Sequence, residues 1–204
     1  KTHSITGKNI LDVYVDKKGK VWAATPEGGL CILENGKFKS VYFYNNNSID
    51  PVQIVQITED GQGNLWLATT DGLDSYNIHT DIVTNHFLDK ENKLIDKRLN
   101  IRYVYVRHTG EIYVGTSLGM YIYHPDNGEA EFFHHDTNDS TSLSHNVVIK
   151  IFEDSKNRIW LGTLGGGLIN FNDQQKTFKN YDMRHGFPDN SIKSIEEDSE
   201  GNLW

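Results

Sequence analysis

The sequence is poor in several features that mark large classes of protein. It holds one cysteine, Cys31, so no disulfide can form within the chain. Lysine and arginine number 20 against 28 aspartate and glutamate residues, and the formal net charge of −8 disfavours nucleic acid or an anionic membrane as a partner. No apolar run approaches the roughly 20 residues that cross a bilayer. We therefore expect no membrane contact by this segment.

Helical, catalytic and metal-binding patterns are also missing. No window keeps a 3.6-residue apolar period over the length of a helix. The chain has no nucleophile elbow, no zinc-protease helix motif and no phosphate-binding loop. His134, His135 and Asp136 suggest a metal site, but adjacent residues of a strand point to opposite faces and are poorly placed to share one ion. We expect no catalytic residue, no metal and no cofactor.

The chain has instead an internal repeat. The stretch Asp154–Leu168 reads DSKNRIWLGTLGGGL, related stretches begin at Asp16, Asp60 and Asp198, and a weaker one begins at Arg107. The aligned aromatic residues, 44 to 47 positions apart, are Trp22, Trp66, Tyr113, Trp160 and Trp204. The aligned threonines are Thr25, Thr69, Thr116 and Thr163. Self-similarity at such a period decides the architecture.

Each copy reads as short strands separated by turns. The tetrad Asp60–Gly63 is turn chemistry, because aspartate bonds its own backbone and glycine accepts a positive φ. Asn157 takes the glycine place in the fourth copy, and asparagine tolerates that conformation well. The segments Leu65–Thr69 and Ile159–Thr163 that follow are rich in strand-forming residues.

A further strand precedes each turn and carries two apolar residues three positions apart. The pairs are Ile10 and Val13, Ile54 and Ile57, Ile101 and Val104, Val148 and Ile151, and Ile192 and Ile195. Residues three apart lie on opposite faces of a regular strand, so we interpret this strand as buried on both faces. A β-bulge would give the same pattern, provided that it recurred in the copies.

A repeat of about 45 residues holds four short strands, and radially repeated four-stranded sheets make a β-propeller. A β-helix is the main rival, but its coils are usually much shorter. We predict an all-β fold with full blades over 10–53, 54–100, 101–147 and 148–191, and part of a fifth over 192–204. Residues 1–204 then form a single propeller segment. We expect this segment to be a piece of a longer propeller that self-associates or has been trimmed, since both broken ends would leave unpaired strand edges.

The repeated tryptophans and threonines have a structural interpretation. Trp22, Trp66 and Trp160 are expected to fill the space between blades, since each side chain is large enough to dominate its local packing. The threonines are expected to satisfy backbone groups at the strand end. Recurrence in every copy favours a role in the scaffold over a role in a binding site.

Three stretches resemble the two-component regulator propeller repeat: Gly186–Trp204, Ile54–Leu73 and Val148–Leu168. The third copy departs most from that repeat, with Tyr113 for tryptophan and Arg107 for the turn aspartate. The resemblance implies the periplasmic sensor half of a hybrid two-component receptor of Bacteroidetes. Such receptors carry two seven-bladed propellers, an all-β domain, a membrane span and cytoplasmic kinase modules. It further implies an oligosaccharide ligand, control of glycan-utilisation genes and a homodimeric receptor.

Two alternative functions are weighed against this one. A protein-interaction propeller remains open, although the paired Gly-His and Trp-Asp marks of WD repeats are missing. The streptogramin lyases are propeller enzymes with similar repeats, and their blades carry a glutamate just after the repeated threonine. Here that position holds Pro26, Thr70, Ser117 and Leu164. The segment is therefore expected not to be an enzyme.

Propeller geometry also predicts where a ligand would bind. The loop between two repeats and the turn after the tryptophan strand lie on one face of such a fold. This places eight residues around one entrance: Asn45, Asn46, His145, Arg184, His185, Glu27, Asp71 and Leu164. Phe187 and Tyr44 are candidate stacking surfaces, and polar groups beside an aromatic plane suit a sugar. We predict a carbohydrate site at this entrance.

Overall fold

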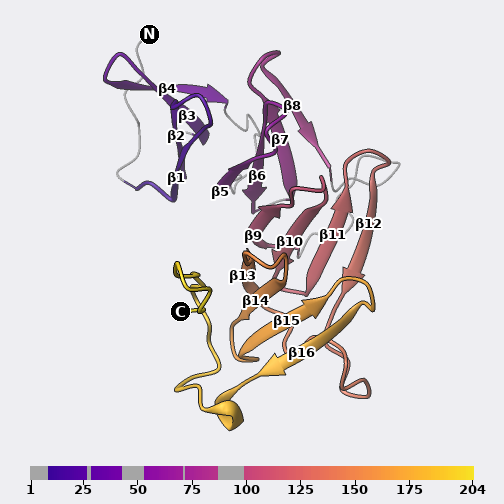
Figure 1. The fold of residues 1–204 in the computed structure, drawn as a ribbon. Helices are drawn as coiled ribbons and strands as arrows, with labels where there is room; N and C mark the ends of the chain where they lie inside the picture. The colour runs from indigo at the N-terminus through magenta and orange to yellow at the C-terminus, as the bar shows by residue number, and fades with distance from the viewer. Residues whose placement is uncertain (1–8, 27–28, 43–52, 71, 87–98) are drawn as a thin grey trace. The chain divides into compact units, whose positions relative to one another are not determined.

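The computed structural model describes residues 9–26, 29–42, 53–70, 72–86 and 99–204 and shows four four-stranded sheets (Figure 1). The first two sheets are β1 (Asp12–Val15), β2 (Val21–Thr25), β3 (Gly29–Glu34), β4 (Lys37–Tyr42), and β5 (Ile54–Glu59), β6 (Asn64–Thr69), β7 (Leu73–Asn77), β8 (Ile82–Asn85). The other two are β9 (Ile101–Val106), β10 (Ile112–Thr116), β11 (Met120–His124), β12 (Glu129–Phe133), and β13 (Val148–Glu153), β14 (Ile159–Thr163), β15 (Leu168–Asn172), β16 (Thr177–Tyr181).

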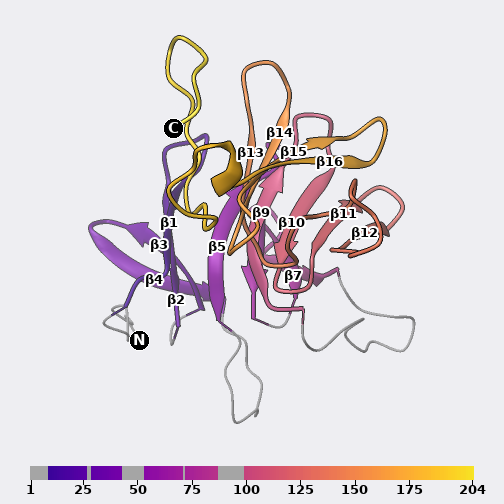
Figure 2. The same ribbon diagram turned by 90° about the horizontal axis from the view of Figure 1, so that it is seen from below.

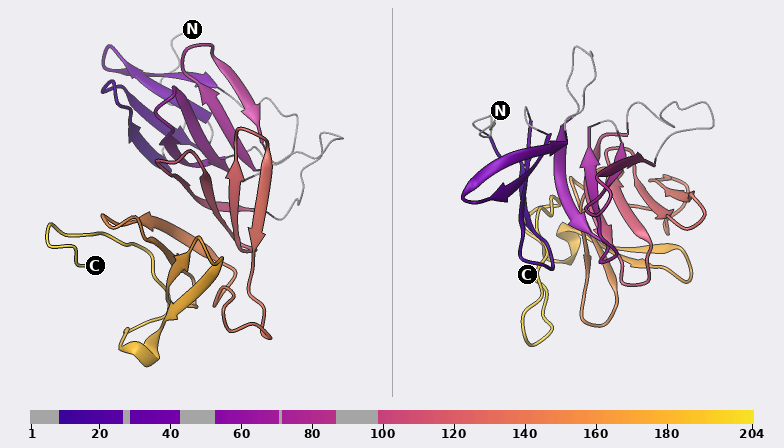
Figure 3. Two further views of the ribbon diagram at one scale, coloured as in Figure 1. Left: turned by 45° about the vertical axis from the view of Figure 1, so that its right-hand side comes forward. Right: turned by 90° about the horizontal axis from the view of Figure 1, so that it is seen from above.

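Strands in each sheet follow chain order and run antiparallel, as Figure 2 and Figure 3 also show. The described residues contain one helix, the 3-10 turn η1 (Met183–His185), and so none that is long and apolar enough to cross a bilayer. The chain divides into two compact units, residues 1–104 and 105–204. The prediction of an all-β fold of four-stranded propeller blades is confirmed. A longer, seven-bladed ring stays a prediction.

The turn chemistry is as the repeat predicts. In the first sheet Asp16 Oδ1 accepts the backbone N–H groups of Lys18 and Lys20, both at 2.9 Å. Gly19 closes that turn at a φ of 78°, in the left-handed region that glycine adopts without steric cost. Asn157 takes the same place in the fourth sheet at a φ of 59°, which confirms its predicted role.

The strand before each turn differs from the sequence-based interpretation. In the second sheet Ile54 faces Thr69 and Gln56 faces the next residue, Ala68, so Val55 is an extra residue in a β-bulge. Ile57 then faces Leu67, which lies on the same side of β6 as Thr69. Ile54 and Ile57 therefore share one face, and the two-faced burial inferred from their spacing was wrong.

The fourth sheet repeats this irregularity. Val148 faces Thr163 and Lys150 faces Gly162, which makes Ile149 the extra residue. The bulge alternative is thus the correct one in these two sheets. The strands that are buried on both faces are instead those that carry the repeated aromatic residue, since every residue of β10 and β14 is buried.

Neighbouring sheets pack through the tryptophan strand of one and the bulged strand of the next. In residues 1–104, Trp22 and Ala24 join one core cluster with Ile54, Ile57 and Leu67. Trp66 and Trp160 are 3% and 7% exposed, as the sequence predicted. Leu65, Ile112 and Ile159 belong to β6, β10 and β14 and are buried.

Three members of the repeat are exceptions to this burial: Ile10, which is 48% exposed, Val13 and Trp204. Val13 is 53% exposed, although the pattern predicted a buried residue, because no described strand in residues 1–104 covers that face of β1. Trp204 is 79% exposed in the fifth copy. Equivalent positions of the repeat are therefore buried only where a second sheet packs against them.

A small residue before each repeated threonine allows the sheets to approach closely. A Cβ at Gly115 would lie 2.8 Å from the carbonyl oxygen of Val148, and one at Gly162 would lie 2.4 Å from that of Ile192. The backbone of the following strand therefore occupies the space that a side chain would need. The first two copies hold Ala24 and Ala68 at this position.

Candidate ligand site and the repeat network

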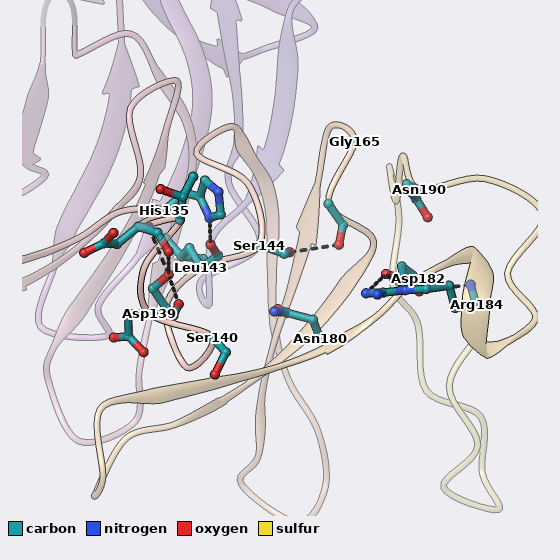
Figure 4. A pocket seen from close by; sticks show the side chains of 14 residues that line it. His135, Asp139, Ser140, Leu143, Ser144, Gly165, Asn180, Asp182, Arg184 and Asn190 are labelled. Carbon is teal, nitrogen blue, oxygen red and sulfur yellow. Dashed lines mark hydrogen bonds and ion pairs between the residues drawn. The ribbon is translucent and has the colours of Figure 1, made fainter.

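A polar pocket with a volume of about 370 Å³ lies in residues 105–204 (Figure 4). One wall is the loop that follows β12, from His135 to Ser144. The turn between β14 and β15 supplies Gly165 and Gly166, and the third wall runs from Asn180 to Asn190. The inter-repeat loop and the turn after the tryptophan strand thus meet at one site, as propeller geometry predicted.

Hydrogen bonds within the loop, including one to the buried Leu143, hold the loop wall in place. Asp136 Oδ1 accepts the backbone N–H of Asn138 at 2.8 Å, and Asp139 Oδ1 accepts that of Thr141 at 2.8 Å. Leu143 is fully buried, and its carbonyl oxygen accepts from His135 Nδ1 at 2.6 Å. These bonds give the polar loop a defined conformation.

The loop is also tied to the turn that forms the second wall. The Ser144 hydroxyl donates to the carbonyl oxygen of Gly166 at 2.8 Å. The Leu164 N–H donates to the carbonyl oxygen of Val147 at 2.9 Å, and the Gly167 N–H donates to that of Asn190 at 2.7 Å. All three walls are therefore connected through the turn between β14 and β15.

Asp182 organises the third wall at the start of η1. Its carboxylate accepts from the backbone N–H, Nε and Nη2 of Arg184 at 2.6 to 3.1 Å, and His185 Nδ1 lies 3.2 Å from Oδ1. The hydrogen bonds from Arg184 lower the pKa of Asp182 to about 2. The arginine that lines the pocket is thus paired with a carboxylate beside it.

Asn180 contributes a polar group that has no partner. Its side-chain amide lies at the edge of β16 and points into the pocket in Figure 4. Within the described residues, its Oδ1 is buried and accepts no hydrogen bond. An unpaired buried acceptor is costly, and this oxygen is closed to solvent in this conformation.

The predicted site residues divide into three groups. Arg184 lines the pocket, and His145 lies beside it, since a Cβ at Gly166 would be 2.6 Å from the His145 Cβ. His185 is half exposed behind Asp182, and Phe187 is half-buried and outside the lining, so it supplies no stacking surface there. Asn45, Asn46, Glu27, Asp71 and Tyr44 lie outside the described residues.

The loop residues that line the pocket were missed by the sequence reasoning. Asp136 was considered only as part of a metal hypothesis with His134 and His135, and Asp139 was not considered. The described residues contain no group of three possible metal ligands. The signal available in the sequence was the density of Asp, Asn, Ser and Thr in this inter-repeat loop, which marks a chain of side-chain-capped turns.

The repeated threonine has the predicted role at the strand end. Thr69 Oγ1 donates a hydrogen bond to the carbonyl oxygen of Gly72 and accepts one from the N–H of Gly72, both at 2.9 Å. Thr116 makes the same pair of bonds with Gly119, and Thr163 donates to Gly167 and accepts from Gly166. One buried hydroxyl therefore closes the turn in each of these copies.

The turn aspartate and the repeated tryptophan are directly bonded. The indole Nε1–H donates to Oδ2 of the aspartate six residues earlier, at 2.8 to 3.1 Å. The four pairs are Asp16 with Trp22, Asp60 with Trp66, Asp154 with Trp160, and Asp198 with Trp204. The spacing of six in the sequence is thus a hydrogen bond that ties the turn to the core.

The third copy keeps this link but reverses its charge. Arg107 takes the place of the aspartate, and its Nη1 donates to the Tyr113 hydroxyl at 3.2 Å. The same guanidinium reaches two carboxylates, Glu153 at 3.2 Å through Nε and Asp173 at 2.7 Å through Nη1. The departure from the repeat is therefore a paired substitution, which places a cation between Glu153 and Asp173.

We expect acid to destabilise the chain through the turn aspartates. Burial acts to raise the pKa of Asp154, but hydrogen bonds from the Trp160 indole and from Arg158 hold it below 3.8. The pKa of Asp16 is lowered in the same way by the hydrogen bond from the Trp22 indole. A lowered folded-state pKa gives stability that is present above the unfolded pKa and is lost as the pH falls below it. The melting temperature should therefore decrease when the pH is lowered below about 4.

Substitution of Asp154, with Asp12 as the control, tests whether the turn aspartate causes the acid effect. Asp12 has a raised pKa because of burial, so its contribution has the opposite sign and Asp12→Asn should leave the acid loss in place. Asp154→Asn should reduce the acid loss. A melting temperature that is constant from pH 6 to pH 3 would contradict the assignment.

Comparisons with known proteins agree with the repeat. The family model described as "Two component regulator propeller" matches residues 48–71, 142–165 and 186–204. Histidine kinase P4 of Formosa agariphila is 31% identical over 122 residues, which are 60% of this chain and 9% of that protein. The chain thus spans a small part of this curated relative.

Solved structures show the same fold. The extracellular domain of a hybrid two-component system from B. thetaiotaomicron matches with a TM-score of 0.78 at 22% identity, over 98% of this chain and 28% of that one. The WD40 β-propeller domain of Doa1 matches with a TM-score of 0.67 at 12% identity, over 96% of this chain and 59% of that one. Three stretches of the chain match the two-component regulator propeller repeat, and the chain folds into blades of a β-propeller.

Proposed function

We propose that this chain is part of the extracytoplasmic sensor of a two-component signalling receptor and that it recognises an oligosaccharide. The receptor would be periplasmic on its sensing side, would act as a homodimer, and would control genes for glycan use. The propeller repeats support the assignment to a signalling receptor. The fold shared with the extracellular domain of a hybrid two-component system supports an extracytoplasmic location. The sensor segment itself carries out no reaction, and kinase activity would belong to other parts of the receptor.

The pocket between the loop after β12, the turn after β14 and the end of β16 is the observation that carries the proposal. Its volume of about 370 Å³ falls in the range of small-molecule sites. Its lining is rich in hydroxyl, amide and carboxylate groups, which hydrogen-bond to sugar hydroxyls. It opens at the face where inter-repeat loops and turns meet, so blades on either side could add contacts to a longer ligand.

The test replaces two residues of the third wall. Arg184→Ala with His185→Ala should weaken oligosaccharide binding at least tenfold, measured by calorimetry on the full chain against a panel of plant and host glycan fragments. Arg184 has an 83% exposed side chain, so the melting temperature should change little. Lys193→Ala, also exposed, is the matched control and should bind as the parent does. Unchanged affinity in the double variant would move the site elsewhere.

A further inference from the structure

The charges that line the pocket are unbalanced. Three acidic residues line it, Asp136, Asp139 and Asp182, against the single guanidinium of Arg184. Because Arg184 holds Asp182 through Nε and Nη2 at 2.6 to 3.1 Å, these two charges largely cancel. The carboxylates of Asp136 and Asp139 remain without a cation among the described residues.

Both of these carboxylates keep one oxygen for a ligand. Oδ1 of Asp136 accepts from Asn138, and Oδ1 of Asp139 accepts from the backbone and hydroxyl of Thr141. Within the described residues, no hydrogen bond engages either Oδ2. The bonds from Thr141 lower the pKa of Asp139, so this group is ionised and can only accept near neutral pH.

The Asn180 side chain lines the opposite wall. The ring of His135 is the only aromatic side chain of the lining, and its Nδ1 is engaged with Leu143. The pocket therefore offers acceptors that need donors. An anionic group placed there would meet two carboxylates without gaining a free cation.

We propose that the pocket selects a sugar rich in hydroxyl groups or bearing an amine, and that it rejects uronate and sulfated sugars. This inference rests on the proposed function and adds the charge class of the ligand to it. Hydroxyl and ammonium groups donate to the free oxygens of Asp136 and Asp139. A uronate carboxylate in the same place is repelled by the two aspartates.

The experiment compares three probes of similar length on the full chain: chitin, chitosan and galacturonate oligosaccharides. The neutral or the amine-bearing probe should bind at least tenfold more tightly than the galacturonate in low salt. Asp136→Asn with Asp139→Asn keeps both Oδ1 acceptors, and so the loop turns, but removes two negative charges. In this variant the ratio of the affinity for the neutral or amine-bearing probe to the affinity for the galacturonate should fall by at least fivefold.

A matched control removes the same charge away from the pocket. Asp126→Asn with Glu129→Gln changes two exposed residues of the β11–β12 hairpin and should leave the preference unchanged. Asn180→Ala should weaken whichever probe binds. If the galacturonate binds more tightly and Asn180→Ala weakens it, the charge inference fails while the proposed function stands. Failure of every probe to bind would overturn both.

Discussion

Replacing Arg107 by aspartate should lower the free energy of unfolding by about 3–5 kcal/mol, because it leaves the buried Glu153 carboxylate without the Arg107 guanidinium. The Arg107 and Glu153 side chains are 13% and 6% exposed, so solvent screens their interaction poorly. Burial opposes the charged form of Arg107, yet its bonds to Asp173 and Glu153 raise its pKa further above the ordinary value. The new aspartate would face both carboxylates. Urea denaturation measures the loss.

The double variant Arg107→Asp with Tyr113→Trp separates the two roles of this position. It restores the aspartate–tryptophan pair of the other copies but not the ion pairs with Glu153 and Asp173. We expect only partial recovery. Charge reversal at Lys39, whose pair with Glu34 spans 4.0 Å and is mostly exposed, is the control and should cost under about 1 kcal/mol. Full recovery in the double variant would show that the ion pairs contribute nothing.

The second large effect is expected at Asp154. Its side chain is fully buried and accepts from the backbone of Lys156 and Arg158, the Arg158 guanidinium and the Trp160 indole, at 2.6 to 3.0 Å. Asp154→Ala leaves the indole and one turn of backbone without acceptors, at a cost of about 1–3 kcal/mol for each buried donor that water does not reach. We expect a total loss of about 3–4 kcal/mol.

The fifth copy supplies a matched control for Asp154. Asp198 makes the same bonds to its turn and to the Trp204 indole, at 2.9 Å, but Trp204 is 79% exposed in this chain. Water can replace the lost acceptor there, so Asp198→Ala should have a far smaller effect on the melting temperature. Equal effects at the two positions would show that burial does not set the strength of this bond.

Much of the fold could be predicted because the repeat records local chemistry. Asp154 and Trp160 are six residues apart, and Thr163 closes a turn that ends at Gly167, so their bonds lie within one hairpin. Because these short-range pairs recur, the strands, the turns and the burial of the tryptophans could be predicted. The Asn157 turn could be predicted for the same reason, since a positive φ is a property of one residue.

Contacts between distant segments were decided by tertiary structure alone. Arg107 meets Glu153 and Asp173, which are 46 and 66 residues away. The first separation is close to the repeat period, but the period does not tell which side chains of neighbouring repeats pair. The strand with the bulge at Val55 was interpreted as buried on both faces, because spacing by itself does not distinguish an extra residue from burial of both faces. The pocket of Asp136, Asp139 and Asn180 exists only because separate loops converge, and polar loops carry no periodic signal of where they will meet.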